Sequence, residues 1–212
     1  MGNPMAERNA LLGATLVKNL KKRGFEAYYC ADKAAALAQA LSLIPKDHVV
    51  SWGGCASVDE IGLKEAVKAE FKTIDRDKAE SPEERVEIMR QGLLADTFLM
   101  GANAITEEGD LFNIDANGNR TAALIYGPRQ VIVVAGMNKI TKDPNSAYLR
   151  MRNTAAPINV QRFEGRQTPC RVTGTCGDCL VADCCCNYIV RVRRCQPQGK
   201  IKVILVGENL GF

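Results

Sequence analysis

Hydrophobic positions along the chain alternate between the spacing of helices and the spacing of buried strands. Leu12, Leu16 and Leu20 recur every four residues, which places them on one face of a helix that Gly24 ends. Further helices are predicted over residues 34–43, 58–68, 81–95, 121–126 and 143–154, and strands over 25–30, 48–52, 71–74, 97–100 and 130–135. Because strands that alternate with helices form mainly parallel sheets, we expect an α/β fold whose sheet is flanked by helices.

Residues 102–120 interrupt this alternation. Glycine turns at Gly109 and Gly118 flank an alternating apolar and polar run, which is typical of a β-excursion with tight turns. Two more strand-like runs follow at 188–194 and 201–206. The chain is therefore predicted to form one domain over residues 1–212, with residues 168–212 appended to the sheet as a cysteine-rich segment and terminal strands.

The composition is that of a globular protein. Of the 212 residues, 46% are hydrophobic and 25% are charged, so the chain can bury a core without disulfides. Its longest apolar run, residues 131–135, is far shorter than the ~18 residues of a membrane helix, and no basic-then-apolar signal peptide is present. We therefore expect a cytoplasmic protein without a membrane partner.

The net charge of +4 is spread along the chain. In the most basic stretch, residues 190–203, arginines and lysines alternate with valines and isoleucines, which predicts the solvent-facing side of two strands. Nucleic-acid-binding proteins concentrate positive charge on one face or element. The charge pattern therefore argues against nucleic acid as a partner.

Seven of the nine cysteines lie between Cys170 and Cys195. An odd number of cysteines, clustered in one segment of a chain expected in the cytoplasm, argues against a disulfide framework. Cys176 and Cys179 form a C-x-x-C pair that can reach one metal ion, and Cys170 and Cys186 could complete four sulfur ligands for zinc or an iron–sulfur cluster. Reduced thiols without metal and a redox-active dithiol are the alternatives.

Three segments carry small or polar residues directly after a predicted buried strand, where open α/β sheets bind ligands. The first contains Gly53 and Gly54, which let the backbone approach a ligand just before the N–H groups of a helix start. The second, residues 101–120, is rich in amides and carboxylates, and the third offers Lys139. Ordinary turns and a solvated lysine would also explain them. The candidate ligand-binding residues are Gly53, Gly54, Ser57, Asn103, Asn113, Gly118, Arg120, Gly136, Asn138 and Lys139.

Together these motifs resemble the lactate-utilisation (LUD) domain, formerly a domain of unknown function. The matching patterns are Gly-Gly-x-x-Ser-x-x-Glu-x-Gly-Leu at 53–63, Gly-x-Asn-Ala-Ile-Thr-x-x-Gly-x-Leu-x-Asn-x-Asp-x-x-Gly-Asn-Arg at 101–120, and Gly-x-Asn-Lys-Ile at 136–140. The resemblance implies the fold shared by ribose-5-phosphate isomerase and coenzyme A transferases, with a ligand at the strand ends. It also implies a role in lactate oxidation beside partner subunits that carry iron–sulfur clusters.

Two departures from the family pattern bear on catalysis. Asn103 stands where the isomerase relatives have an acidic residue, and Cys55 follows the glycines where many LUD domains have serine. A thiol at a helix start is a candidate nucleophile, and Glu60 and Asp115 are candidate acids or bases. Each also has a structural explanation, since Cys55 would pack as a small buried residue and Glu60 would favour the helix dipole.

The cysteine-rich segment also resembles the tail of single-domain LUD proteins. The shared patterns are Pro-Cys, Thr-Gly-x-Cys-x-Asp-Cys and Cys-Asn, and they imply Cys170, Cys176, Cys179 and Cys186 as the metal ligands. Cys184, Cys185 and Cys195 are additional. The resemblance leaves the identity of the metal open between zinc and an iron–sulfur cluster.

These observations lead to one main hypothesis and two alternatives. The main hypothesis is a protein that binds a small anionic metabolite and has an accessory or subunit role in the oxidation of lactate or another organic acid. The alternatives are a stand-alone isomerase or transferase acting on a sugar phosphate or coenzyme A ester, and a metal-dependent protein-interaction module. The expected partners are the metabolite, iron–sulfur subunits and a second copy of the chain in a homo-oligomer.

Overall fold

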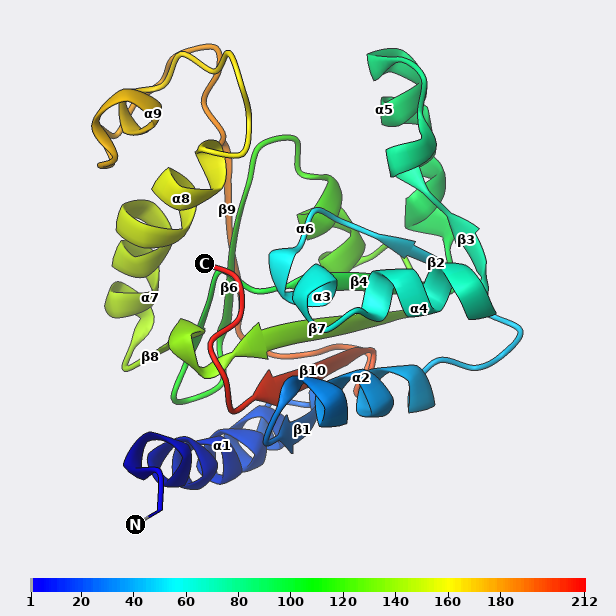
Figure 1. Ribbon diagram of the computed structural model, residues 1–212, viewed down its shortest axis with the longest axis vertical. Coiled ribbons are helices and arrows are strands. Elements are labelled where there is room, and N and C mark those ends of the chain that lie inside the picture. The colour runs from blue at the N-terminus through cyan, green and yellow to red at the C-terminus, as the bar shows by residue number, and fades with distance from the viewer. Residues whose placement is uncertain (1) are drawn as a thin grey trace.

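A parallel sheet forms the centre of the structure, a computed structural model that describes residues 2–212 (Figure 1). In the described part of the chain this sheet has six strands, and every neighbouring pair is parallel. Their order is β1 (Glu26–Cys30), β10 (Ile201–Val206), β7 (Gln130–Gly136), β4 (Thr97–Gly101), β2 (Val49–Trp52) and β3 (Lys72–Ile74). The predicted α/β fold with a mainly parallel sheet is confirmed.

Helices cover both faces of this sheet because alternate residues of its strands point to opposite sides. On one face, Val133 and Leu205 pack with the predicted leucine stripe of α1 (Pro4–Lys22), in which Leu16 and Leu20 are fully buried, and with α6 (Asn119–Ile125). On the other face, Ile132 packs with α2 (Lys33–Ser42), α3 (Ala56–Glu60) and α4 (Leu63–Glu70). The core is thus divided into two apolar layers by the sheet.

The helix predicted over residues 58–68 is two helices, α3 and α4. Gly62 separates them with a φ of +75°, in the left-handed region that interrupts a right-handed helix. The helical periodicity hid this break, because a glycine within a helical pattern is compatible with either outcome. The break turns the chain so that α4 continues along the sheet while α3 stays at the end of β2.

The excursion over residues 102–120 builds a second, smaller sheet. Its strands, in order, are β8 (Ile140–Thr141), β5 (Ala104–Thr106), β6 (Leu111–Asp115) and β9 (Tyr188–Val192). Strands β5 and β6 pair antiparallel, as a tight turn requires, and Gly109 and Gly118 both have positive φ. The β-strand interpretation of this segment is confirmed.

The terminal strands join both sheets. Strand β9 pairs with β6, and β10 lies between β1 and β7 in the interior of the parallel sheet, so it is an integral strand of that sheet. Its almost continuous burial is that of a strand covered on both faces. No helix within residues 2–212 is long and apolar enough to cross a membrane.

The remaining helices form two groups, one at each side of the view in Figure 1. On one side are the short 3₁₀ turn η1 (Arg76–Lys78), α5 (Pro82–Gln91) and a further 3₁₀ turn, η2 (Gly92–Leu94). On the other side are α7 (Pro144–Arg150), a π-helical turn η4 (Met151–Ala155), α8 (Ala156–Val160) and α9 (Pro169–Thr173). The 3₁₀ turn η3 (Met137–Lys139) follows β7 directly.

Candidate functional site

A cavity of about 490 Å³ lies at the carboxyl ends of β2, β4 and β7. Gly53 and Gly54 line it after β2, Gly101 at the end of β4 and Asn103 just beyond line it next, and Lys139 lines it after β7. The three segments singled out in the sequence therefore meet in one recess. Side chains of η1 and α5 form one wall, and α8 with the residues after it forms another.

The two glycines admit two arginine side chains to the floor of the cavity. A Cβ atom at Gly53 would overlap the Arg120 side chain, with Cδ only 2.5 Å away, and a Cβ at Gly54 would lie 2.9 Å from Arg76 Nη2. Side chains larger than hydrogen would displace both arginines. The double glycine thus brings two guanidinium groups against the backbone at the end of β2.

Asp115 holds the start of α6 and its arginine in place. Its carboxylate accepts hydrogen bonds from the backbone N–H groups of Ala116, Arg120 and Thr121 at 3.0, 3.0 and 3.2 Å. Arg120 Nη2 in turn donates to the carbonyl of Ile114 at 2.7 Å. Asp115 lines the cavity, but both of its oxygens already accept hydrogen bonds, so its position there is that of a structural anchor.

Asn103 ties β4 to the second sheet. Its side-chain oxygen accepts a hydrogen bond from the N–H of Ile114 at 3.0 Å, and its carbonyl accepts one from Arg150 Nη1 at 2.5 Å. Within residues 2–212 no hydrogen bond uses its side-chain NH₂ group, so this donor is available to a ligand in the cavity. Two other candidates, Asn113 and Gly118, do not line the cavity.

Asn113 is fully buried, and both polar atoms of its side chain lack a hydrogen-bond partner among the described residues. Gly118 has a φ of +78° and precedes α6, where a Cβ would lie 3.4 Å from the ring of Tyr188. Gly118 therefore serves the turn that places Arg120. We have no physical account of the unpartnered amide of Asn113.

Lys139 is the buried cation of the cavity. It is only 4% exposed, and its ammonium group donates a hydrogen bond to Ser57 Oγ at 2.9 Å. Burial lowers the pKa of Lys139, and the positive charges of Arg150 and Arg120 act in the same direction. Within residues 2–212 no carboxylate lies within ion-pair distance of it.

Cys55 lies beside Lys139 at the end of β4. A Cβ atom at Gly101 would lie 2.7 Å from Cys55 Sγ and 3.8 Å from Lys139 Nζ, so the glycine leaves room for both side chains. Cys55 is 6% exposed and lines the cavity. Of the three catalytic candidates, it is therefore the one whose side chain combines a place in the cavity with freedom from structural hydrogen bonds among the described residues.

Several candidate residues bind the segment 208–212 instead of facing the cavity. Asn138 accepts a hydrogen bond from the N–H of Leu210 at 3.1 Å, and its NH₂ group donates to the carbonyl of Gly211 at 3.3 Å. The Glu60 carboxylate is exposed and accepts from the N–H of Gly211 at 3.0 Å. Gly136 lies directly under the segment. This segment covers Ser57 and Lys139, a contact that the sequence analysis missed.

The sequence also did not indicate most of the cationic residues that line the cavity. Among residues 2–212, seven cationic side chains line it against three carboxylates. The cations are Lys64, Arg76, Arg85, Arg120, Lys139, Arg162 and Arg166, and the carboxylates are Asp59, Asp77 and Asp115. Asp77 lies within 4 Å of Lys64, Arg76 and Arg85, and Lys64 also pairs with Asp59 at 2.7 Å. Basic residues on η1, α5 and the α8 side are ordinary surface residues in the sequence, and only the fold directs them inward.

The cysteine-rich segment brings several of its thiols near one another. The four predicted ligands Cys170, Cys176, Cys179 and Cys186 are free thiols, and Cys176 Sγ accepts a hydrogen bond from Arg152 Nη2 at 3.3 Å. Burial, with neighbouring thiols, raises the pKa of Cys186 to about 12. In the described part of the chain no three Cys, His, Asp or Glu side chains are arranged to hold a metal. Metal binding at these cysteines stays a prediction.

Three comparisons show which known proteins this chain is similar to. The family model of the LUD domain matches residues 14–206. Among solved structures, a DUF162 family protein from Deinococcus radiodurans is similar with a TM-score of 0.51 at 15% identity, over 93% of this chain and 98% of that one. The comparison with curated proteins gives no match at a significant level.

Two isomerases show weaker similarity. Ribose 5-phosphate isomerase A from Methanocaldococcus jannaschii has a TM-score of 0.34 at 17% identity, over 53% of this chain and 55% of that one. The 5-methylthioribose 1-phosphate isomerase from Pyrococcus horikoshii has a TM-score of 0.37 at 14% identity, over 76% and 51%. The family match, which extends over most of the chain, confirms the resemblance drawn from the motifs: this protein belongs to the LUD-domain family.

Proposed function

We propose that this LUD-domain protein binds a small anionic metabolite in the cavity and has an accessory or subunit role in the oxidation of lactate or another organic acid. The observation that carries the proposal is the surplus of cations over carboxylates in one recess at the strand ends. That surplus includes Lys139, which is buried without an acidic partner among the described residues. Anions bind where preorganised donors and positive charge converge.

The cations of the cavity destabilise one another in the absence of an anion. Burial lowers the pKa of Arg76, and the neighbouring Arg85 and Arg120 add to this effect. Burial and two arginines likewise lower the pKa of Lys139. Each of these groups stays charged at a cost in free energy, and an anion placed among them would reduce that cost. Electrostatics therefore favours a negatively charged ligand over a neutral one.

The isomerase or transferase alternative has less support from the geometry. Glu60 lies outside the cavity, and the Asp115 carboxylate is occupied by backbone N–H groups. A catalytic role would have to use Cys55, whose thiol lines the cavity beside Lys139. Binding requires only the cations and free donors that are already in place, so we favour it.

The proposal keeps zinc or an iron–sulfur cluster in the cysteine-rich segment only because the cysteines there could serve as its ligands. Thiolates are suitable ligands for both, but within residues 2–212 no three such side chains are placed to hold one metal ion. We therefore derive no electron-transfer step through this segment. Metal and sulfide analysis of anaerobically purified protein tests it, and a stoichiometric content of either would support a metal site.

Thermal unfolding of the full chain tests the proposed function. Carboxylates, sugar phosphates and coenzyme A esters are screened, and an anion at about a hundredfold its Kd should add ~2.7 kcal/mol to the free energy of unfolding. For a chain of this length that corresponds to a rise in Tm of about 5–11 °C. Sodium chloride at matched ionic strength is the control for screening. The proposal fails if no anion raises Tm more than the salt does.

Anion affinity should also depend on pH through Lys139. Because burial lowers the pKa of Lys139, the group loses its charge at a lower pH than an exposed lysine, and affinity should fall as pH rises through that value. Bound anion favours the charged form, so binding near that pH should take up a proton. Calorimetry in buffers of different ionisation enthalpy measures this uptake. A Lys139→Met variant with the same pH profile as the natural protein would contradict the assignment.

A further inference from the structure

We infer that the ligand of this cavity carries two anionic groups, one at each end, and is larger than lactate. The inference rests on the proposed function and adds the class of ligand. It follows from the size of the cavity and from the positions of five of its cations, three of which lie at the strand ends and two just after α8. Figure 1 shows the two walls, with η1 and α5 on one side and α8 with the following residues on the other.

The cavity is too large for a three-carbon hydroxy acid. Lactate has six non-hydrogen atoms, and even at the ~30 Å³ that a water molecule occupies in the liquid it would fill about 180 Å³. The cavity measures about 490 Å³, within the range of roughly 300–1,000 Å³ that holds larger ligands. A single lactate would leave more than half of the space, and most of the charge, to solvent.

The inner group of cations lies at the strand ends. Arg76 and Arg120 lie against Gly54 and Gly53, and Lys139 follows β7. The side chains of Arg76 and Arg120 are each 15% exposed, and Lys139 is 4% exposed. The only carboxylates that neutralise the two arginines among the described residues are Asp77 and Asp115. This inner group has the donors and charge for one phosphate or carboxylate.

The outer group of cations consists of Arg162 and Arg166, just after α8. Arg162 lies over the rings of Phe163 and Phe212, at 6.0 and 5.9 Å from their centroids, and no carboxylate lies within ion-pair distance of it in residues 2–212. Arg166 has one distant ion pair, to Asp183 at 4.0 Å. Aromatic rings orient a guanidinium without neutralising it, so its charge stays available to an anion.

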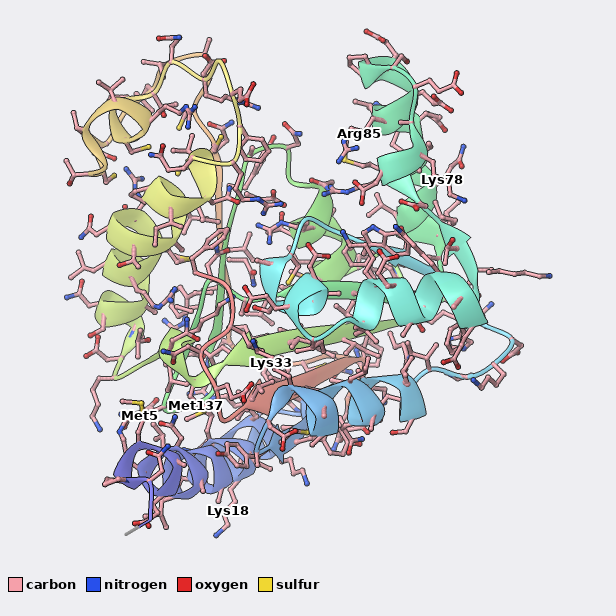
Figure 2. The ribbon with its side chains drawn as sticks, viewed as in Figure 1. Met5, Lys18, Lys33, Lys78, Arg85 and Met137 are labelled. Atoms are coloured by element: carbon pink, nitrogen blue, oxygen red, sulfur yellow. The ribbon has the colours of Figure 1, made fainter. Side chains whose placement is uncertain are left out.

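Another cation, Arg85, and polar side chains also line the cavity. Arg85 extends from α5 toward the side of the molecule on which α8 lies (Figure 2), and it shares Asp77 with Arg76. Asn117, Asn119 and Asn159 also line the cavity. A ligand whose two charged ends are joined by a hydroxylated or amide-containing middle would engage both groups and these side chains together.

The experiment compares single-ended and two-ended anions on the full chain by calorimetry. Inorganic phosphate and lactate are the single-ended probes, and linear dicarboxylates and bisphosphates of increasing carbon length are the two-ended probes. We expect two-ended probes of one optimal length to bind about 10- to 150-fold more tightly than single-ended ones, because each end adds charge-assisted hydrogen bonds. The dicarboxylate and bisphosphate series distinguish the two kinds of anionic end.

Variants at the outer group separate this inference from the proposed function. The double variant Arg162→Met/Arg166→Met should reduce the affinity for two-ended probes to that of single-ended probes, and it should weaken inorganic phosphate binding much less. Arg76→Met should weaken both kinds of probe. Arg129→Met is the matched control, because that side chain is 82% exposed and lies outside the cavity.

Two results would overturn the inference in different ways. Equal affinity for single-ended and two-ended probes, or no dependence on their length, would refute the two-ended ligand while the proposed anion binding stands. Failure of every probe to bind would refute the proposed function and this inference together.

Discussion

Replacing Lys139 with methionine should weaken anion binding by about 10- to 150-fold and leave the protein folded. The ammonium group is the most deeply buried cation of the cavity, and a hydrogen bond to a charged group contributes roughly 1.5–3 kcal/mol. Methionine has a similar length and no charge, so its burial carries no desolvation penalty. Calorimetric titration with whichever anion the thermal screen identifies measures the loss.

The matched control is Lys142→Met. Lys142 lies three residues further along the chain, pairs with Glu107, and is 77% exposed outside the cavity. It should bind the anion as the natural protein does. Anion affinity that is the same in Lys139→Met and Lys142→Met would show that the buried ammonium does not contact the ligand.

Replacing Gly136 with alanine should lower the free energy of unfolding by about 2–3 kcal/mol. The backbone of Gly136 has φ −71° and ψ 156°, which alanine adopts freely, so the expected effect comes from contact alone. A Cβ would overlap Leu210 N and lie 2.5 Å from Asn138 Oδ1 and 2.7 Å from Glu208 O. The segment 208–212 would have to move off Lys139 and Ser57. Thermal denaturation should show a Tm lower by about 4–12 °C.

Gly62→Ala is the comparison for this variant. Gly62 has positive φ, and a Cβ there would meet no atom within 4 Å, so the substitution introduces backbone strain of about 1 kcal/mol without overlap. The overlap at Gly136 should therefore be the more destabilising change. If Gly62→Ala is the more destabilising of the two, the packing of the segment 208–212 on β7 is not as tight as described.

Local signals in the sequence were enough for most of the architecture. The leucine stripe of residues 12–20 predicts the helix whose Leu16 and Leu20 are fully buried, and the all-apolar run 131–135 predicts the central strand β7. Both follow from the periodicity of side chains along one element. The place of β10 between β1 and β7 does not, because strand order depends on pairing between residues more than sixty positions apart.

In the candidate site, too, some residues can be selected from the sequence and others cannot. The double glycine, Asn103 and Lys139 could be selected from the sequence because small and polar residues after buried strands are where open sheets bind ligands. Glu60 and Asn138 could not be separated from them, although their side chains bind the segment 208–212. In both segments the motif is the same whether a side chain faces the ligand or the neighbouring backbone.

The sequence by itself determined the class of fold, the family and the strand ends at which the cavity lies, because these depend on short-range patterns of burial and turn residues. Only the tertiary structure decided which charges line the cavity. Arg76 comes from η1, Arg85 from α5 and Arg162 from the residues after α8, and in the sequence all three look like ordinary solvated positions. Packing of these elements around the strand ends directs the arginines inward, and long-range packing leaves no mark on the local pattern.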